Sequence, residues 1–426
     1  MAQIAAELGL SAGDPYSIGL FCAGLAFLVA IAALSYQNER AFSAAVIYLG
    51  LGLTAGVGLF VLGIEPLDPI EDAELVSRVA EMALLVAVFT AGLKMERNFT
   101  FASWRSVVLL IALVLPATVA LVMAFGTLVM GLSLGAALIL GGVLAATDPV
   151  LAGDIGVGAP GDQPREPEDP QFAITAEAGL NDGLSAPFVL LGILVAGGAS
   201  AGDVVEWAFV DLLYAVVVGA ALGAAGGYGM AALAVPLRKR ELFLPQFDGF
   251  VSIAAPLLLY GATEAIGAYG LVAGFAGGLA FRRYEFGHEY NRRVHDGAEV
   301  VEKLLELAVI LLLGSMVTLS ALDEPGVAGW LLVPALLLVF RPAAVFLLFS
   351  YGPLTMRGRG FVAWFGVRGV ATVYFATVAV QTGVLPLGEL STVVWTALVC
   401  VMASILVHGV TGSPLTRRLG YEAPRD

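Results

Sequence analysis

Two acidic side chains stand five residues apart within one long apolar stretch of the sequence. Residues 175–183 read TAEAGLNDG, and the two acids are Glu177 and Asp182. In a helix, Glu177 and Asn181 would share a face, whereas Asp182 would lie about 140° round from Glu177. One helix therefore offers two carboxylates to different neighbours. One can be held in an ion pair while the other stays free to bind a proton or a cation.

A third acid precedes a proline in another apolar stretch, in the order Thr147-Asp148-Pro149. Proline has no N–H, so Pro149 removes the helical hydrogen bond to the carbonyl of Ala145. The break leaves backbone oxygens beside the Asp148 carboxylate and the Thr147 hydroxyl. Oxygen ligands of this kind suit a hard cation such as Na⁺. The alternative is a proline kink near the membrane surface with a solvated acid.

Two arginines also lie within apolar stretches. Residues 338–342 read LVFRP around Arg341, and residues 366–369 read GVRG around Arg368. An unpaired guanidinium inside a membrane is costly, so Arg341 needs a carboxylate partner, for which Glu177 is the candidate. Arg368 is a candidate to compensate the dipole of a broken helix. We expect both arginines to support the scaffold rather than to contact a substrate.

The composition places these residues in a polytopic membrane protein. Of the 426 residues, 59% are hydrophobic and 13% are charged, and the mean hydropathy is +0.90. A soluble domain has roughly 25% charged residues, and about 20 apolar residues cross the hydrocarbon core as a helix. Read at that length, the sequence predicts thirteen spans, at 16–36, 42–64, 74–93, 106–125, 130–152, 171–197, 206–234, 247–262, 265–281, 300–321, 328–351, 360–380 and 389–411. The short eighth and ninth spans could instead form one re-entrant unit.

Two of these spans are interrupted, which indicates an internal repeat. The fifth is broken at Asp148-Pro149 and the twelfth at residues 366–369, seven spans later. An odd offset reverses the direction of a helix through the membrane, as two inverted six-helix repeats joined by a linker helix would require. We therefore expect an all-α chain that forms one transmembrane domain over residues 1–426.

The distribution of Lys and Arg predicts the orientation. With the N-terminus outside and the C-terminus inside, most of the 21 basic residues fall in inside segments, whereas the outside connection at residues 65–72 has none. The inside segments include an acidic, Gly- and Pro-rich loop at residues 153–170 and a short tail at residues 412–426.

Charge and cysteine content exclude several classes of function. With 35 acidic and 21 basic residues, the net charge of −14 argues against a nucleic-acid partner. Cys22 and Cys400 both lie in apolar runs, and the three histidines form no cluster with them, so neither a disulfide framework nor a structural zinc site is expected. No Walker-type phosphate loop is present. We expect neither a cofactor nor enzymatic activity.

The remaining acids within or near spans are expected to be solvated or at the membrane interface. Arg78 and Glu81 have the i, i+3 spacing of a local ion pair, and His408 is expected to be packed rather than to relay protons. Apart from Glu81, the acids of this group are Asp211, Glu264, Glu302 and Glu306.

Taken together, the motifs resemble the prokaryotic sodium/proton antiporters of the monovalent cation:proton antiporter family 1, the NhaP type. The resemblance covers nearly the whole chain. It rests on four motifs in order, which are residues 147–149, Glu177 with Asn181-Asp182, Arg341-Pro342 and residues 366–369.

The resemblance implies a fold and a set of roles. The fifth and twelfth helices would be unwound and would cross mid-membrane, with Pro149 and Arg368 supporting the crossing. Asp182 would be the cation- and proton-binding acid. The other ligating residues would be Asp148, Thr147 and Asn181, and Glu177 would pair with Arg341. Such proteins are homodimers in the cell membrane that move their core like an elevator, exchange Na⁺ or Li⁺ for H⁺, and serve pH homeostasis.

One departure leaves the transported cation open. The family often has Ser directly after the Glu, and this chain has Ala178. Thr175 or water could replace that hydroxyl, and a K⁺/H⁺ antiporter of the same family is an alternative. A cation-coupled symporter for an organic solute, a channel and an intramembrane aspartyl protease are further alternatives.

A single buried carboxylate can account for the exchange of a cation for a proton. Such a group can bind a proton or a cation but not both, so a protein that changes access only when the site is occupied must exchange the two ions. If Asp182 alone titrates, one monovalent cation displaces one proton. We therefore expect electroneutral 1:1 antiport.

Overall fold

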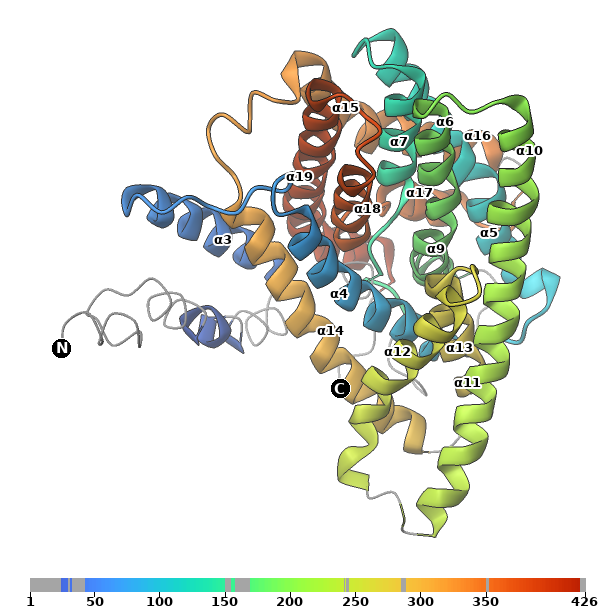
Figure 1. The fold of residues 1–426 in the computed structure, drawn as a ribbon. Coiled ribbons are helices and arrows are strands. Elements are labelled where there is room, and N and C mark those ends of the chain that lie inside the picture. The colour runs from blue at the N-terminus through green and yellow to red at the C-terminus, as the bar shows by residue number, and fades with distance from the viewer. Residues whose placement is uncertain are drawn as a thin grey trace, which may run out of the picture.

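In a computed structural model, most of the described residues lie in helices (Figure 1). The structure describes residues 24–29, 31–32, 43–149, 155–157, 169–240, 242, 245–284, 289–349 and 352–421. Within these ranges no residue lies in a β-strand. The expected all-α fold class is confirmed.

The first half of the chain forms long helices, two of which contain a π-helical segment. In order they are α3 (Ala44–Val61), α4 (Ala73–Leu93), α5 (Phe101–Leu109) continued by the π-helix η1 (Leu110–Val114) into α6 (Leu115–Leu128), α7 (Leu134–Ala145), α9 (Pro170–Ala196), and α10 (Ala201–Trp207) continued by the π-helix η2 (Ala208–Tyr214) into α11 (Ala215–Lys239).

The second half begins with a short 3₁₀-helix and ends with the longest unbroken α-helix. Its elements are η3 (Pro245–Phe250), α12 (Val251–Glu264), α13 (Gly270–Tyr284), α14 (Glu289–Ser315), α15 (Gly326–Ala335) continued by the π-helix η4 (Leu336–Phe340) into α16 (Arg341–Leu348), α17 (Met356–Trp364), α18 (Val370–Gln381) and α19 (Leu387–Leu419).

Each predicted span from 42–64 onward overlaps one of these helices or a continuous series of them, except the span at 360–380, which covers α17, α18 and the non-helical residues between them. The span at 16–36 falls mostly outside the described residues, so the count of thirteen stays a prediction. Seven of the described helices are long and apolar enough to cross a membrane, and α7 and α18 are shorter apolar helices. The predicted eighth and ninth spans are two separate helices, α12 and α13.

The predicted C-terminal tail differs from the structure, and a predicted loop lies mostly outside the described residues. The helix α19 continues to Leu419, so the first part of the tail predicted at 412–426 is helical. Apolar packing stabilises this extension, since Leu415 and Leu419 pack against a buried cluster that includes Phe361 and Phe365. Most of the loop predicted at 153–170 lies outside the described residues.

The two halves of the chain share a local pattern. A π-helical turn directly precedes a proline in each half, with η1 ahead of Pro116 and η4 ahead of Pro342. A proline ring clashes with the carbonyl four residues earlier, and a wider turn relieves that clash. In each half the next helix along the chain is broken, α7 after Ala145 and α17–α18 between Trp364 and Val370. The repeated order supports the expected inverted repeat.

The two broken helices lie where two groups of helices meet. One group includes α3, α4, α13 and α14, which pack on one another, and the other includes α7, α9, α18 and α19. The helix α18 packs on both α19 and α4, and α9 packs on α7 and on α4. In Figure 1, α3 and the long α10–α11 helix lie on opposite flanks of the molecule, with the broken helices between them.

Candidate functional site

The non-helical segments of the two broken helices are joined to each other. After Ala145 the chain becomes extended, with Ala146 at φ −58° and ψ 137°. The backbone N–H of Asp148 then donates to the carbonyl oxygen of Val367, at 2.9 Å. Val367 lies in the gap between α17 and α18, so the break in the first half meets the break in the second.

Two opposite charges cap the helix ends that this crossing exposes. The Asp148 Oδ2 atom accepts from the backbone N–H of Val370, the first residue of α18, at 2.9 Å. Arg368 Nη1 donates to the carbonyls of Ala145 and Ala146, where α7 ends, at 2.7 and 2.9 Å. A carboxylate therefore stands at a helix N-terminus and a guanidinium at a helix C-terminus, where each opposes the helix dipole.

These contacts revise one expectation. The carbonyl oxygens freed by Pro149 were expected to be available as cation ligands. Those of Ala145 and Ala146 instead accept hydrogen bonds from Arg368. Pro149 itself is buried directly after the extended segment.

Two glycines allow the charged groups to approach the backbone. A Cβ atom on Gly369 would collide with the Asp148 carboxyl group, and a Cβ on Gly366 would lie 2.7 Å from Arg341 Nε. The φ of Gly369 is −165°, a value open to any residue, so the requirement there is space. The motif at residues 366–369 is thereby explained by contact with the two buried charges.

Asn181 holds the other broken segment through a reciprocal pair of hydrogen bonds. Its Oδ1 accepts from the backbone N–H of Thr147 at 3.0 Å, and its Nδ2 donates to Thr147 Oγ1 at 2.7 Å. The amide therefore fixes the position of Thr147 against α9. The neighbouring residues Asp148 and Asp182 are both fully buried.

Glu177 and Arg341 form a bidentate ion pair. Arg341 Nη1 and Nη2 donate to the two carboxylate oxygens of Glu177 at 2.6 and 2.7 Å, and Nη2 also donates to the carbonyl of Val362 at 3.2 Å. Both side chains are buried, so neither charge is solvated by bulk water. The contact links α9 to α16 and, through Val362, to α17.

Asp182 stands in a different environment from Glu177. Within the described part of the chain, neither of its carboxylate oxygens has a hydrogen-bond partner, although the residue is 0% exposed. Its electrostatic neighbours are Asp148, which repels a negative charge, and Arg368, which attracts one. An ionised carboxylate without a partner is strongly unfavourable inside a protein. The group is therefore suited to carry a proton or to meet a cation.

Thr175 does not occupy the place of the hydroxyl missing at Ala178. The Thr175 hydroxyl donates to the carbonyl of Gln171 at 2.9 Å and accepts from the backbone N–H of Val157 at 3.1 Å. The first contact lies within α9, and the second joins the segment at residues 155–157 to the start of that helix. Of the two replacements considered for the hydroxyl, Thr175 is therefore engaged elsewhere.

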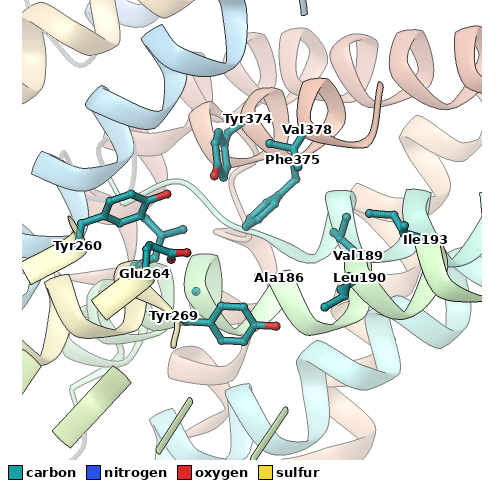
Figure 2. Close-up of a pocket in the computed structure, with 12 residues that line it drawn as sticks. Ala186, Val189, Leu190, Ile193, Tyr260, Glu264, Tyr269, Tyr374, Phe375 and Val378 are labelled. Atoms are coloured by element: carbon teal, nitrogen blue, oxygen red, sulfur yellow. The ribbon is translucent and has the colours of Figure 1, made fainter. Parts of the chain in front are cut away.

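A cavity of about 190 Å³ reaches the residue next to Asp182 (Figure 2). It lies among α9, α12, α13 and α18, and Gly183 forms part of its lining. Figure 2 shows Tyr260, Tyr374 and Glu264 grouped on one side and Val189 and Leu190 on the other. The cavity brings an acidic, tyrosine-rich wall to within one residue of the candidate site.

Several polar residues of the interior were assigned wrongly or missed from the sequence. Glu302 and Glu306 were expected to be solvated or interfacial, but both are buried. Glu81 accepts from Arg78 Nη1 at 3.1 Å, as its spacing predicts, and also from the hydroxyl of Tyr260 at 2.5 Å.

Ser404 is a positioning residue that sequence reasoning missed. Its hydroxyl accepts from the backbone N–H of Arg368 at 2.8 Å and lies 3.0 Å from Nδ1 of His408. His408 is packed as expected, with Nε2 2.9 Å from the carbonyl of Trp364. A lone serine within an apolar helix gives no signal of this role.

Comparisons with known proteins agree with this architecture. The "Na(+)/H(+) antiporter 2" of Zygosaccharomyces rouxii is 26% identical over 349 residues, which cover 78% of this chain and 42% of the yeast protein. The "K(+)/H(+) antiporter NhaP" of Alkalimonas amylolytica is 24% identical over 97% of this chain and 69% of its own length. The chain spans about half or less of the length of the yeast relatives that it matches.

A solved structure shows the same fold. It is that of the sodium proton antiporter MjNhaP1 from Methanocaldococcus jannaschii, which superposes with a TM-score of 0.67 over 93% of this chain and 99% of the other, at 18% sequence identity. The family model for the transmembrane sodium/hydrogen exchanger matches residues 22–418. The chain therefore belongs to the sodium/hydrogen exchanger family of multi-pass membrane proteins.

Proposed function

We propose that the protein is a secondary antiporter that exchanges Na⁺ or Li⁺ for H⁺ across a cell membrane. The observation that carries the proposal is Asp182, a fully buried carboxyl group with no hydrogen-bond partner among the described residues. Family membership and the names of the relatives support the same activity.

In this proposal the cation and the proton compete for one carboxyl group. Asp182 binds either ion, and Thr147, Asp148 and Asn181 complete the site. Because Asp148 Oδ2 and the Asn181 amide already hold the crossing together, their contribution to cation binding comes from their remaining oxygen lone pairs. Glu177, Arg341 and Arg368 hold the framework and do not exchange protons.

Alternating access completes the mechanism. We propose that the unit with α7, α9, α18 and α19 moves against the unit with α3, α4, α13 and α14, in a homodimer of the cell membrane. We propose the prokaryotic inner membrane as its location, as the family resemblance implies, and the Lys and Arg distribution favours the N-terminus outside and the C-terminus inside. The cavity beside Gly183 is a suitable route to the site from one side.

Potassium is the second candidate cation. The relative from Alkalimonas amylolytica is named a K⁺/H⁺ antiporter. The hydroxyl that the family resemblance leads us to expect after the glutamate is absent at Ala178, and Thr175 is engaged by Gln171 and Val157. Water is then the ligand left to fill that place, and a water ligand imposes less restriction on cation size.

The test is transport by the full chain in proteoliposomes. Fluorescence dequenching should report proton movement when Na⁺ or Li⁺ is added without any organic solute. With only Asp182 titrating, exchange should be 1:1, generate no sustained current and be independent of an imposed diffusion potential. A response to K⁺ alone would select the second candidate. Exchange that requires an organic solute, or no exchange with any of the three cations, would contradict the proposal.

The rate should pass through a maximum with pH. At low pH protons occupy Asp182 and exclude the cation, and at high pH the return step lacks protons. Measuring initial rates at equal internal and external pH checks this expectation. A rate that rises continuously across the range in which the protein stays folded would show that proton and cation do not share a group.

A further inference from the structure

A second, larger cavity lies between α5 and η1 on one side and α11 and α13 on the other. Its volume is about 810 Å³, within the range of roughly 300–1,000 Å³ typical of ligand sites. The lining is apolar apart from three residues, Trp104, Tyr228 and Arg283. The complementary ligand is therefore long and apolar, with an anionic group at the Arg283 end.

Small side chains keep this cavity open. Gly223 of α11 packs so tightly on α13 that an added Cβ atom would collide with the backbone of Ala273. The next residue, Ala224, lines the cavity, as does Ala220 one turn earlier. Ala276 contributes a similar wall from α13. The two helices thus contact each other through glycine and present alanine to the cavity, where larger side chains would fill the space.

The Arg283 end has the properties of a membrane interface. Arg283 lies in the last turn of α13, is exposed, and donates from Nη2 to the carbonyl of Arg97 at 3.0 Å. Its neighbour Arg282 is paired with Glu96, whereas no carboxylate in the described ranges is paired with Arg283. Tyr228 contacts Tyr284 edge to face, with ring centroids 5.0 Å apart. Tyr and Trp beside Arg are typical of the headgroup level.

The opposite end of the cavity reaches the helix that carries Asp182. Leu180 of α9 and Val272 of α13 form part of the lining. Val272 is also the residue that a Cβ atom on Gly183 would strike. The cavity therefore extends from the level of Arg283 to the centre of the protein. This is the extent of one acyl chain within one leaflet.

We infer that this cavity binds an acyl chain of one anionic phospholipid, with the phosphate held by Arg283. A guanidinium offers five N–H donors and binds phosphate oxygens in a bidentate manner. One donor is used by the carbonyl of Arg97, and among the described residues the other donors have no partner and are available to the ligand. The chain contributes the apolar contact that Ala220, Ala224 and Ala276 leave unfilled. This binding does not depend on which cation the protein transports.

The test uses the purified full-length protein in detergent, titrated with dioleoylphosphatidylglycerol or dioleoylphosphatidylcholine. Native mass spectrometry counts bound lipid, and thermal unfolding reports the stabilisation. Wild type should bind one phosphatidylglycerol per protomer more tightly than phosphatidylcholine. The variant Arg283→Gln should weaken that binding by about tenfold or more, because an ionic hydrogen bond is lost. Arg357→Gln, which removes an exposed arginine outside the cavity, should not.

Filling the cavity provides an independent arm of the experiment. Ala224→Trp should abolish the specific binding, and Ala276→Leu should weaken it if the tryptophan variant does not fold. Ala221→Trp, on an exposed position of α11 outside the lining, is the matched control. Equal binding of the two lipids would overturn the inference, as would full binding by Arg283→Gln or by a folded cavity-filling variant. Stabilisation by glycerol phosphate alone would also overturn it, because the acyl chain would then be dispensable.

Discussion

Glu177 and Asp182 lie on the same helix, yet the protein treats the two carboxyl groups in opposite ways. Glu177 is held by both terminal nitrogens of Arg341, at 2.6 and 2.7 Å. Asp182 has no hydrogen-bond partner in the described ranges and is equally buried. A charge neutralised by a fixed partner cannot be exchanged for a mobile ion, whereas an unpartnered carboxyl group requires a proton or a cation. The contrast separates a structural acid from a proposed transport acid within five residues.

At the crossing of the two broken helices, structural charges are likewise separate from the proposed transport acid. Asp148 and Arg368 each satisfy backbone groups of the other broken helix, at 2.7–2.9 Å. Asp148 and Arg368 compensate the helix dipoles where the helices end. Asp182 has no structural role of this kind. Asp182 therefore stands next to a rigid arrangement whose charges are already balanced, and a small ion or proton changes the charge of that one group.

The largest expected effect is the loss of transport in Asp182→Asn. The amide has nearly the same shape, but it carries no charge to balance a cation and does not exchange protons. We expect no exchange above that of protein-free vesicles, while gel filtration and helical circular dichroism remain those of wild type. Asp323→Asn, at an exposed turn, is the matched control and should transport normally. Exchange at the wild-type rate by Asp182→Asn would show that Asp182 is not the transport acid.

Breaking the ion pair between Glu177 and Arg341 should lower the stability of the protein. Glu177→Gln and Arg341→Gln each leave a buried charge without its partner, at a cost of roughly 3–5 kcal/mol in the free energy of unfolding. The double variant should cost less than the sum, and denaturation in detergent measures the difference. The half-exposed pair of Glu299 and Lys303 is the control, with a coupling below about 1 kcal/mol. Additive costs for Glu177 and Arg341 would mean that the two charges are not coupled.

A smaller effect is expected where the crossing meets a glycine. In Gly369→Ala the new methyl group collides with the Asp148 carboxyl group, and overpacking of this kind costs roughly 1–3 kcal/mol. Gly360→Ala, in α17 with open space around its Cβ position, should instead stabilise by up to about 1 kcal/mol. Comparing the two unfolding midpoints checks the close approach. Equal shifts would show that the crossing tolerates a side chain.

The sequence predicts the contacts of those charged residues whose burial in a membrane is energetically costly. A mid-span arginine needs a carboxylate, and the pattern indicated Glu177 for Arg341, which is the contact in the structure. Arg368 was expected to compensate a broken helix, and it caps the end of α7. These inferences succeed because few partners are chemically able to satisfy a buried charge.

Contacts between segments that lie far apart in the sequence could not be predicted in this way. The contact between Asp148 and the N–H of Val370 spans 222 positions and appears only when the two breaks are superposed. The burial of Glu302 and Glu306 was not predicted, because both lie near the start of the predicted span at 300–321, where an interfacial position was expected. In the structure α14 packs on α3 and α4, and both glutamates are buried. The π-helical turns were also missed, although the prolines that follow two of them were visible.

Competition at Asp182 is tested most directly by proton release from the purified protein. Na⁺, Li⁺ or K⁺ is added to the full chain in weakly buffered detergent solution with a pH indicator, and choline serves as the control cation. Wild type should release protons, and its apparent cation affinity should rise by up to about tenfold per pH unit while the site remains protonated. Asp182→Asn should release none, and Asp323→Asn should match wild type. Proton release from Asp182→Asn equal to that of wild type would contradict the account, because the exchanging group would then lie elsewhere.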